Sequence, residues 1–192
     1  MYKIAHRLIL PALLLVLSGV GLRAQGVRPG LLQSPKGMGL TVVFDSKDGG
    51  EMDILSARTD FCGLLSGRTR DVGAAVHYSH DYIFFRTEGE DYTLSLHAGA
   101  GGLLGWVHDF ENGFFSDYDR QMDHNPGFAV GATGNFGLRL DFSRCLTLDL
   151  SFSVHPGIHV RVNKSTGALL ASFYKAGVYH AYYPQLNLLY RF

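Results

Sequence analysis

Charged, amide and imidazole side chains recur at alternate positions within otherwise apolar segments of this 192-residue chain. Alternate residues of a β-strand point to the same face, so each segment predicts a strand with one polar and one apolar face. Aspartate, arginine and histidine on facing strands can form ion pairs, exchange protons or bind a metal ion. The side chains on the predicted polar faces are Asp45, Arg58, Asp60, His77, His97, Asn135, Arg139, Asp141, Asp149, His155, His159, Arg161, Gln185, Asn187 and Arg191.

His155 and His159 are the pair whose chemistry most suggests a metal site. Four residues of an extended strand separate their side chains by ~13 Å, which is too far for both to bind one ion. We therefore expect each to pair with Asp149 or Asp141 rather than with a metal. No motif in the sequence predicts a cofactor.

The longest segment without alternation, 110–126, combines acidic and aromatic residues. Its carboxylates could bind Ca²⁺, but their spacing is not that of an EF-hand loop. Such a segment is also suited to contact a protein partner or a glycan, because binding residues are often carried on loops. The candidate recognition residues are Phe114, Phe115, Asp117, Tyr118 and Asp119.

The alternating segments that would position these side chains are long. Most exceed the ~5–6 residues typical of strands in soluble proteins and match strands that cross a bilayer. No helical period separates them, which excludes an α/β fold. A transmembrane up-and-down barrel with both ends on one side needs an even number of strands, so we divide 72–86 at 79–81 and expect eight. The segments are 37–45, 55–61, 72–86, 92–107, 128–142, 146–162 and 178–192.

The first residues predict an export signal rather than a structural element. A basic head precedes an apolar run, 8–20, that is too short for a membrane helix and is followed by a plausible cleavage site. We expect a signal peptide at 1–24, a periplasmic lead-in at 25–36 and an antiparallel β-barrel at 37–192. The exported chain would be slightly acidic, so no nucleic-acid partner is expected.

Two classes of barrel fit the same alternation. A soluble barrel of the lipocalin type would turn its apolar face inward, whereas an outer-membrane barrel would turn that face toward lipid. Aromatic residues repeat near the strand ends on the apolar face, and the chain ends on an aromatic strand, which favours the membrane class. The predicted anchors at the membrane interface are Trp106, Phe128, Phe142, Tyr182, Tyr190 and Phe192.

Four segments carry a resemblance to a known family. They read GAGGLLGWVHDF at 99–110, GNFGLRLDF at 134–142, LTLDLSF at 146–152 and YPQLNLLYRF at 183–192. In these segments the chain resembles the small outer-membrane β-barrel proteins of Bacteroides-like bacteria (Bacteroidetes). The resemblance implies a location in the outer membrane of a Gram-negative cell. It also implies that barrel-assembly machinery recognises the last strand.

The interior of an eight-stranded barrel is just wide enough to be filled by its own side chains. We therefore expect an integral outer-membrane protein with a plugged polar interior. Its partners would be membrane lipid and an unknown extracellular ligand or protein, met through 110–126 and 163–177. A narrow, porin-like channel is one alternative. Another is a lipid-modifying hydrolase, which would need a base and a nucleophile near the outer rim, facing lipid. The candidates are His108 and His180 on the strands and Ser116 and Ser172 in the adjoining loops.

Overall fold

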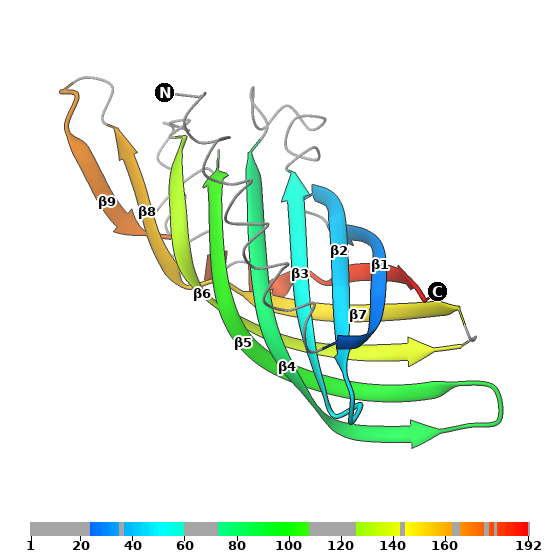
Figure 1. Cartoon of the computed structure of the whole chain (residues 1–192). Helices are drawn as coiled ribbons and strands as arrows, with labels where there is room; N and C mark the ends of the chain where they lie inside the picture. Colours follow the sequence, from blue (N-terminus) through cyan, green and yellow to red (C-terminus); the bar gives the residue numbers. More distant parts are fainter. Residues whose placement is uncertain are drawn as a thin grey trace.

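The computed structural model describes residues 24–34, 37–59, 73–107, 126–142, 145–162, 166–174, 177–178 and 180–191. In this part of the chain ten strands form one antiparallel sheet (Figure 1). No helix among these residues is long and apolar enough to cross a membrane. The elements are β1 (Ala24–Ser34), β2 (Gly37–Ser46), β3 (Glu51–Thr59), β4 (Ala74–Glu88), β5 (Thr93–Val107), β6 (Gly127–Asp141), β7 (Leu146–Val154), β8 (Gly157–Val162), β9 (Leu169–Phe173), the 3-10 helix η1 (His180–Tyr182) and β10 (Gln185–Tyr190).

The sheet closes on itself into a barrel. Its strands follow the order β5-β4-β3-β2-β1-β10-β7-β6, and β5 pairs with β6 to complete the ring. β8 continues β7, because the register along β6 runs from Gly134↔Val154 to Gly131↔Gly157 without a shift. β9 and β10 are the two sections of the last strand, with η1 between them. The barrel therefore has eight strand positions, as the alternation predicted.

Two expected boundaries are nevertheless wrong. The segment read as a periplasmic lead-in is the strand β1, which pairs with β2 on one side and β10 on the other. The turn expected at 79–81 does not form, because β4 is continuous there and pairs with β3 and β5. Ser79 and Asp81 look like turn residues but are buried, so their polarity reflects the barrel interior. The count of eight survives because these two errors cancel. The loop expected at 163–177 is wrong as well, because that segment contains the strand β9 and the buried Tyr174.

Both ends of the described chain lie at the same end of the barrel. Ala24 pairs with Ser46 beside the β2–β3 turn, and Tyr190 pairs with Leu146 beside the β6–β7 connection. The β4–β5 turn is at this end too, on a hairpin that extends past the start of β3 (Figure 1). We call this the short-turn end. The segments between β3 and β4 and between β5 and β6 leave from the opposite end.

The two faces of the strands differ in chemistry. Many large apolar side chains are exposed on the outer face, whereas most of the buried side chains are polar or charged. Among the described residues, buried apolar side chains form two clusters. One cluster is Val43, Met52, Ile54 and Leu189, and the other is Ala75, Leu103, Val107, Ala129 and Tyr174.

Adjacent glycines of β5 differ sharply in the space around them. A Cβ on Gly101 would overlap the carbonyl oxygen of Tyr78 and the Cα of Ser79, whereas a Cβ on Gly102 would meet only the carbonyl oxygen of Gly131 at 3.6 Å. The inward-facing glycine is therefore required by close approach of β4, and its neighbour is not.

We expect Gly101→Val to lower the thermal unfolding temperature strongly and Gly102→Val to change it little. The reason is that only the first substitution forces two paired strands apart. Circular dichroism of the purified protein during heating would measure both. Equal effects of the two variants would contradict this assignment of inner and outer faces.

Candidate functional site

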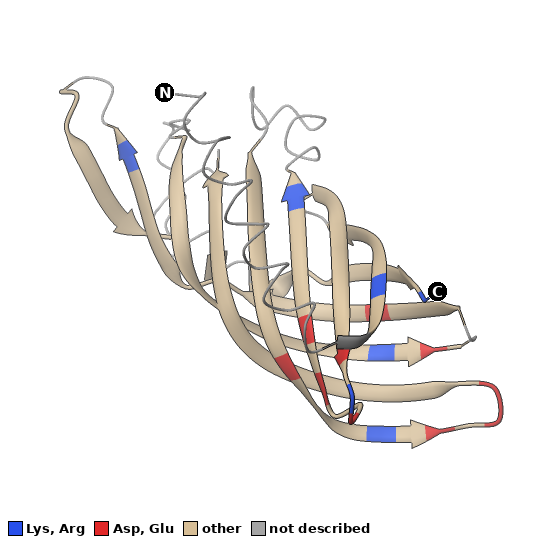
Figure 2. Ribbon diagram, viewed as in Figure 1, with Lys and Arg blue, Asp and Glu red and all other residues tan. Residues whose placement is uncertain are grey.

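The polar faces meet inside the barrel, and their side chains form what we call the interior network. Its lowest layer, at the short-turn end, is built from two arginines and two aspartates. Arg28 Nε lies 2.7 Å from Asp45 Oδ2, and Arg139 Nη1 lies 2.8 Å from Asp45 Oδ1. Asp141 contacts both arginines and accepts a hydrogen bond from Thr147. These ion pairs join β1, β2 and β6 across the interior. Figure 2 shows positively and negatively charged positions on these strands.

His97 lies at the centre of the next layer. Its Nδ1 is 2.7 Å from Asp81 Oδ2, and its Nε2 is 2.8 Å from Asp149 Oδ2. The side chains of His97 and Asp81 are fully buried and that of Asp149 nearly so. One imidazole thus bridges carboxylates on β4 and β7, which are not neighbours in the sheet.

Amide and hydroxyl groups extend this layer around the ring. Asn135 Nδ2 donates to Asp81 at 2.8 Å, and Ser153 Oγ donates to Asn135 at 3.0 Å. From β10, Gln185 Nε2 donates to Ser153 at 2.6 Å, and Asn187 Nδ2 donates to Asp149 at 2.9 Å. The layer therefore links the last strand to β4 through side chains, although the two strands are not paired in the sheet.

The upper layer holds the other buried histidines of the described chain, which are His77, His155 and His159. The rings of His77 and His155 are 5.4 Å apart, and His155 Nδ1 is 3.0 Å from Thr133 Oγ1. The expected pairing of His155 and His159 with Asp149 or Asp141 is wrong. Asp149 contacts His97, and Asp141 contacts the two arginines of the lowest layer. Over the described ranges, no group of three His, Cys, Asp or Glu side chains could hold a metal ion.

Most residues predicted for the polar interior do face it. Arg191, in contrast, follows β10 and is exposed, and Asp60 lies outside the described residues. Two charged members of the interior network were not predicted. Arg28 was missed because its segment was read as a lead-in, and Asp81 because it was read as part of a turn. The predicted residues that are buried or half-buried are Asp45, Arg58, His77, His97, Asn135, Arg139, Asp141, Asp149, His155, His159, Arg161, Gln185 and Asn187.

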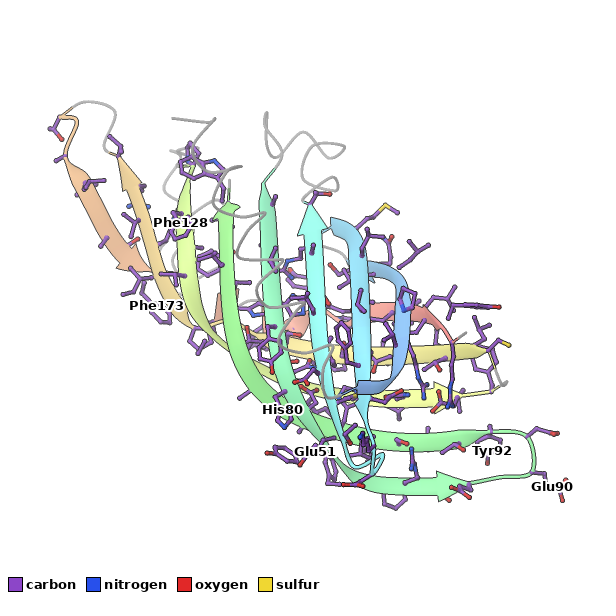
Figure 3. The ribbon with its side chains drawn as sticks, viewed as in Figure 1. Glu51, His80, Glu90, Tyr92, Phe128 and Phe173 are labelled. Atoms are coloured by element: carbon purple, nitrogen blue, oxygen red, sulfur yellow. The ribbon has the colours of Figure 1, made fainter. Side chains whose placement is uncertain are left out.

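The predicted interface anchors lie on the outer face or at the strand ends. Phe128, Phe142, Tyr182 and Tyr190 are exposed, and Trp106 is half-buried. Figure 3 shows Phe128 near the upper end of β6, close to the end of β5 where Trp106 pairs with it. Phe192 lies outside the described residues.

The five candidate recognition residues of the longest loop also lie outside the described residues, as do His108 and Ser116. The side chain of His180, in η1, is not described. Ser172 is not in a loop as expected but in β9, where it pairs with His159 of β8. It is half-buried and shares the inward face with Tyr174. The proposed nucleophile therefore does not lie on the lipid-facing rim.

A polar cavity of about 810 Å³ opens at the short-turn end. Its lining includes Arg86 and Glu88 of the β4–β5 hairpin and the exposed Arg191. A β-bulge between Ile83 and Phe85 shifts the register there and pairs Arg86 with the buried Ser95. The cavity reaches Arg28 and Asp141, so the ion pairs of the lowest layer form its floor.

No family model and no curated protein matches the chain. Among solved structures, the chain is similar to the N-terminal β-barrel domain of Pseudomonas aeruginosa OprF. The TM-score is 0.45 and the sequence identity 12%, with 88% of this chain and 99% of that domain covered. The assignment of an eight-stranded barrel rests on the strand pairing described above and not on this likeness.

We expect Arg139→Met to lower the free energy of unfolding by about 3–5 kcal/mol, because it leaves buried carboxylates without one of their partners. Arg191→Met is the matched control, since that side chain is exposed, and we expect it to change stability by less than about 0.5 kcal/mol. Urea unfolding of the detergent-solubilised protein would measure both. Similar losses for the two variants would show that the ion pairs do not contribute as described.

Proposed function

We propose that this chain is an integral outer-membrane β-barrel protein with a plugged interior and a structural or surface-interaction role. The observation that carries the proposal is the reversed polarity of the barrel. The side chains of Leu40 and Leu31 are 64% and 62% exposed, whereas Arg139 and His97 are 1% and 0% exposed.

This polarity argues against a soluble barrel. A soluble barrel would bury its apolar face and present its charges to water. Here Leu138, Leu150 and Leu186 lie side by side on β6, β7 and β10 and are each about two-fifths exposed. Monomeric soluble proteins rarely expose a continuous apolar surface of this extent. A bilayer provides the apolar surroundings that such a surface requires. The pairings β1–β10 and β5–β6 close the ring, while β9 pairs only with β8 among the described strands.

The arrangement of the connections supports an orientation in the membrane. Outer-membrane barrels have short periplasmic turns and longer external loops. We infer that the short-turn end faces the periplasm and that 110–126 and the β8–β9 connection, 163–168, face outward, where they contact an extracellular ligand or protein. We further propose that 1–24 is a cleaved signal and that assembly machinery recognises β10. An origin in Bacteroides-like bacteria, from the resemblance of the four segments, belongs to the same proposal.

A narrow channel is the second candidate, and one feature favours it. His77 Nδ1, Ser79 Oγ and Ser95 Oγ are buried without a hydrogen-bond partner among the described residues. Buried polar atoms of this kind commonly bind water. Because ion pairs occupy the lowest layer at the short-turn end, we still favour the plugged barrel.

Cell fractionation tests the location. We expect the protein to sediment with outer membranes and to be released by detergent but not by salt, because its apolar belt requires a lipid-like environment. Recovery in the aqueous fraction without detergent would overturn the proposal.

Substitution in the belt provides a sharper test. Leu150→Arg should lower the free energy of unfolding in lipid vesicles by up to about 2–4 kcal/mol, because an arginine near the bilayer centre is costly. Leu169→Arg, at the tip of the β8–β9 hairpin, is the matched control and should have a small effect. In a water-soluble barrel both leucines would face solvent, and the two variants would behave alike.

Planar-bilayer recording separates the plugged barrel from the channel. We expect the reconstituted protein to give no sustained single-channel steps, because ion pairs block the lumen at Arg28 and Arg139. Regular steps that change in size when Arg139 is replaced by Met would support the channel instead.

A further inference from the structure

One part of the outer face departs from the apolar belt. Near the short-turn end, β3 and β4 carry four outward polar residues, which we call the outer polar cluster: Glu51, Asp53, Tyr78 and His80. Tyr78 Oη donates to Asp53 Oδ1 at 2.6 Å, and His80 Nδ1 lies 2.9 Å from the same oxygen. His80 and Glu51 lie on the outer side of the ribbon in Figure 3.

On β3 the cluster lies at the start of the strand, whereas on β4 the exposed Tyr82 and Phe84 continue past it. Glu51 directly follows the β2–β3 turn and pairs with Tyr82, and Asp53 pairs with His80 two residues further along. Two residues of strand correspond to about 6–7 Å. In the proposed orientation, this is the depth of the lipid headgroups in the periplasmic leaflet.

An apolar groove of about 780 Å³ adjoins the cluster and runs toward the opposite end of the barrel. Its small outward residues are Ala57, Ala74 and Gly102, and the larger Leu40 and Leu104 are also part of its lining. The volume is within the range of small-molecule sites. Because almost all of the lining is apolar, the groove suits a hydrocarbon chain.

Tyr78 connects the two features. Its side chain is part of the groove lining, and its hydroxyl is hydrogen-bonded to Asp53 of the cluster. A single ligand with a polar end and an apolar chain would therefore meet both regions at once. Among membrane components, a phospholipid has this shape.

The charge of the cluster selects the headgroup. Two carboxylates face one imidazole, so the cluster stays negative even when His80 is protonated. The side chain of Glu51 is half-exposed, and its Oε2 lies 3.9 Å from His80 Nε2, which is beyond hydrogen-bonding distance. Glu51 can therefore accept hydrogen bonds from a ligand ammonium. His80 donates to Asp53 through Nδ1, and in its protonated form it can also donate from Nε2 to a ligand phosphate.

We propose that the outer polar cluster and the groove together bind one phospholipid with a primary-amine headgroup from the periplasmic leaflet. The ammonium contacts Glu51, the phosphate contacts His80, and one acyl chain lies along Ala57 and Gly102. This inference rests on the proposed membrane location.

Native mass spectrometry of the full chain in detergent tests the proposal. The protein is offered phosphatidylethanolamine, phosphatidylglycerol and phosphatidylcholine with identical acyl chains. We expect one phosphatidylethanolamine to be retained about tenfold better than the other two, which is the scale of one charge-assisted hydrogen bond. Equal retention of the three lipids, or preference for either of the others, would overturn it.

Two matched pairs of variants assign the binding to this site. Glu51→Gln should remove the preference for phosphatidylethanolamine, whereas Glu90→Gln at the tip of the β4–β5 hairpin should keep it. Ala57→Leu should fill the groove and lower retention, whereas Ala171→Leu, outward on β9, should not. Unchanged circular dichroism shows that each variant is folded. If the members of either pair behave alike, the lipid binds elsewhere.

The other possible occupant of the groove is a second copy of the chain. A dimer that is lost in Ala57→Leu would overturn the lipid assignment. A protein that fractionates with outer membranes but shows no headgroup preference overturns only this inference. Recovery of the protein in the aqueous fraction would overturn the proposed function as well.

Discussion

The pairing of Arg28 and Arg139 with Asp45 and Asp141 is the interaction on which the rest of the barrel depends. Charges removed from water are tolerated only when opposite charges and hydrogen bonds compensate them. The four side chains come from β1, β2 and β6, so they meet only when the ring is closed. The ring of strands therefore closes in the same step in which these four buried charges are neutralised. Buried polar atoms also need hydrogen-bond partners, which explains why the interior contains so many short polar side chains. These side chains hydrogen-bond the polar atoms that take no part in the ion pairs.

A polar interior has a direct consequence for the outer face. Successive side chains of a strand point to opposite faces, so each residue that faces the interior network places its two sequence neighbours on the outer face. In β7, Asp149, Ser151 and Ser153 are buried while Leu150 and Phe152 are exposed. In the proposed outer-membrane location, lipid would cover this apolar surface. The outer polar cluster on β3 and β4 is a local exception to the apolar outer face.

Much of this arrangement could be predicted from alternation, and the rest depends on register. The inward positions of Arg139 and Asp149 follow from clean period-two segments. Arg28 could not be found this way, because Pro29 and the glycines around it obscure the alternation of β1. Asp81 was missed because serine, histidine and aspartate are also common in turns. The partners of His97 lie on two different strands, and only the pairing registers bring those carboxylates together.

The seam between β1 and β10 has a consequence for how the barrel forms. From β2 to β7, each pair of consecutive strands is hydrogen-bonded. These contacts join residues that are close in sequence, so each closes a comparatively short loop. The seam joins residues more than a hundred positions apart through four pairs, from Gly30↔Leu189 to Gln33↔Leu186. Contacts at such separation are slow to form, because the entropy of closing a long loop must be overcome first. The β1–β10 pairing is thus the last to form while the barrel assembles. It is also where an applied force would first separate two neighbouring strands.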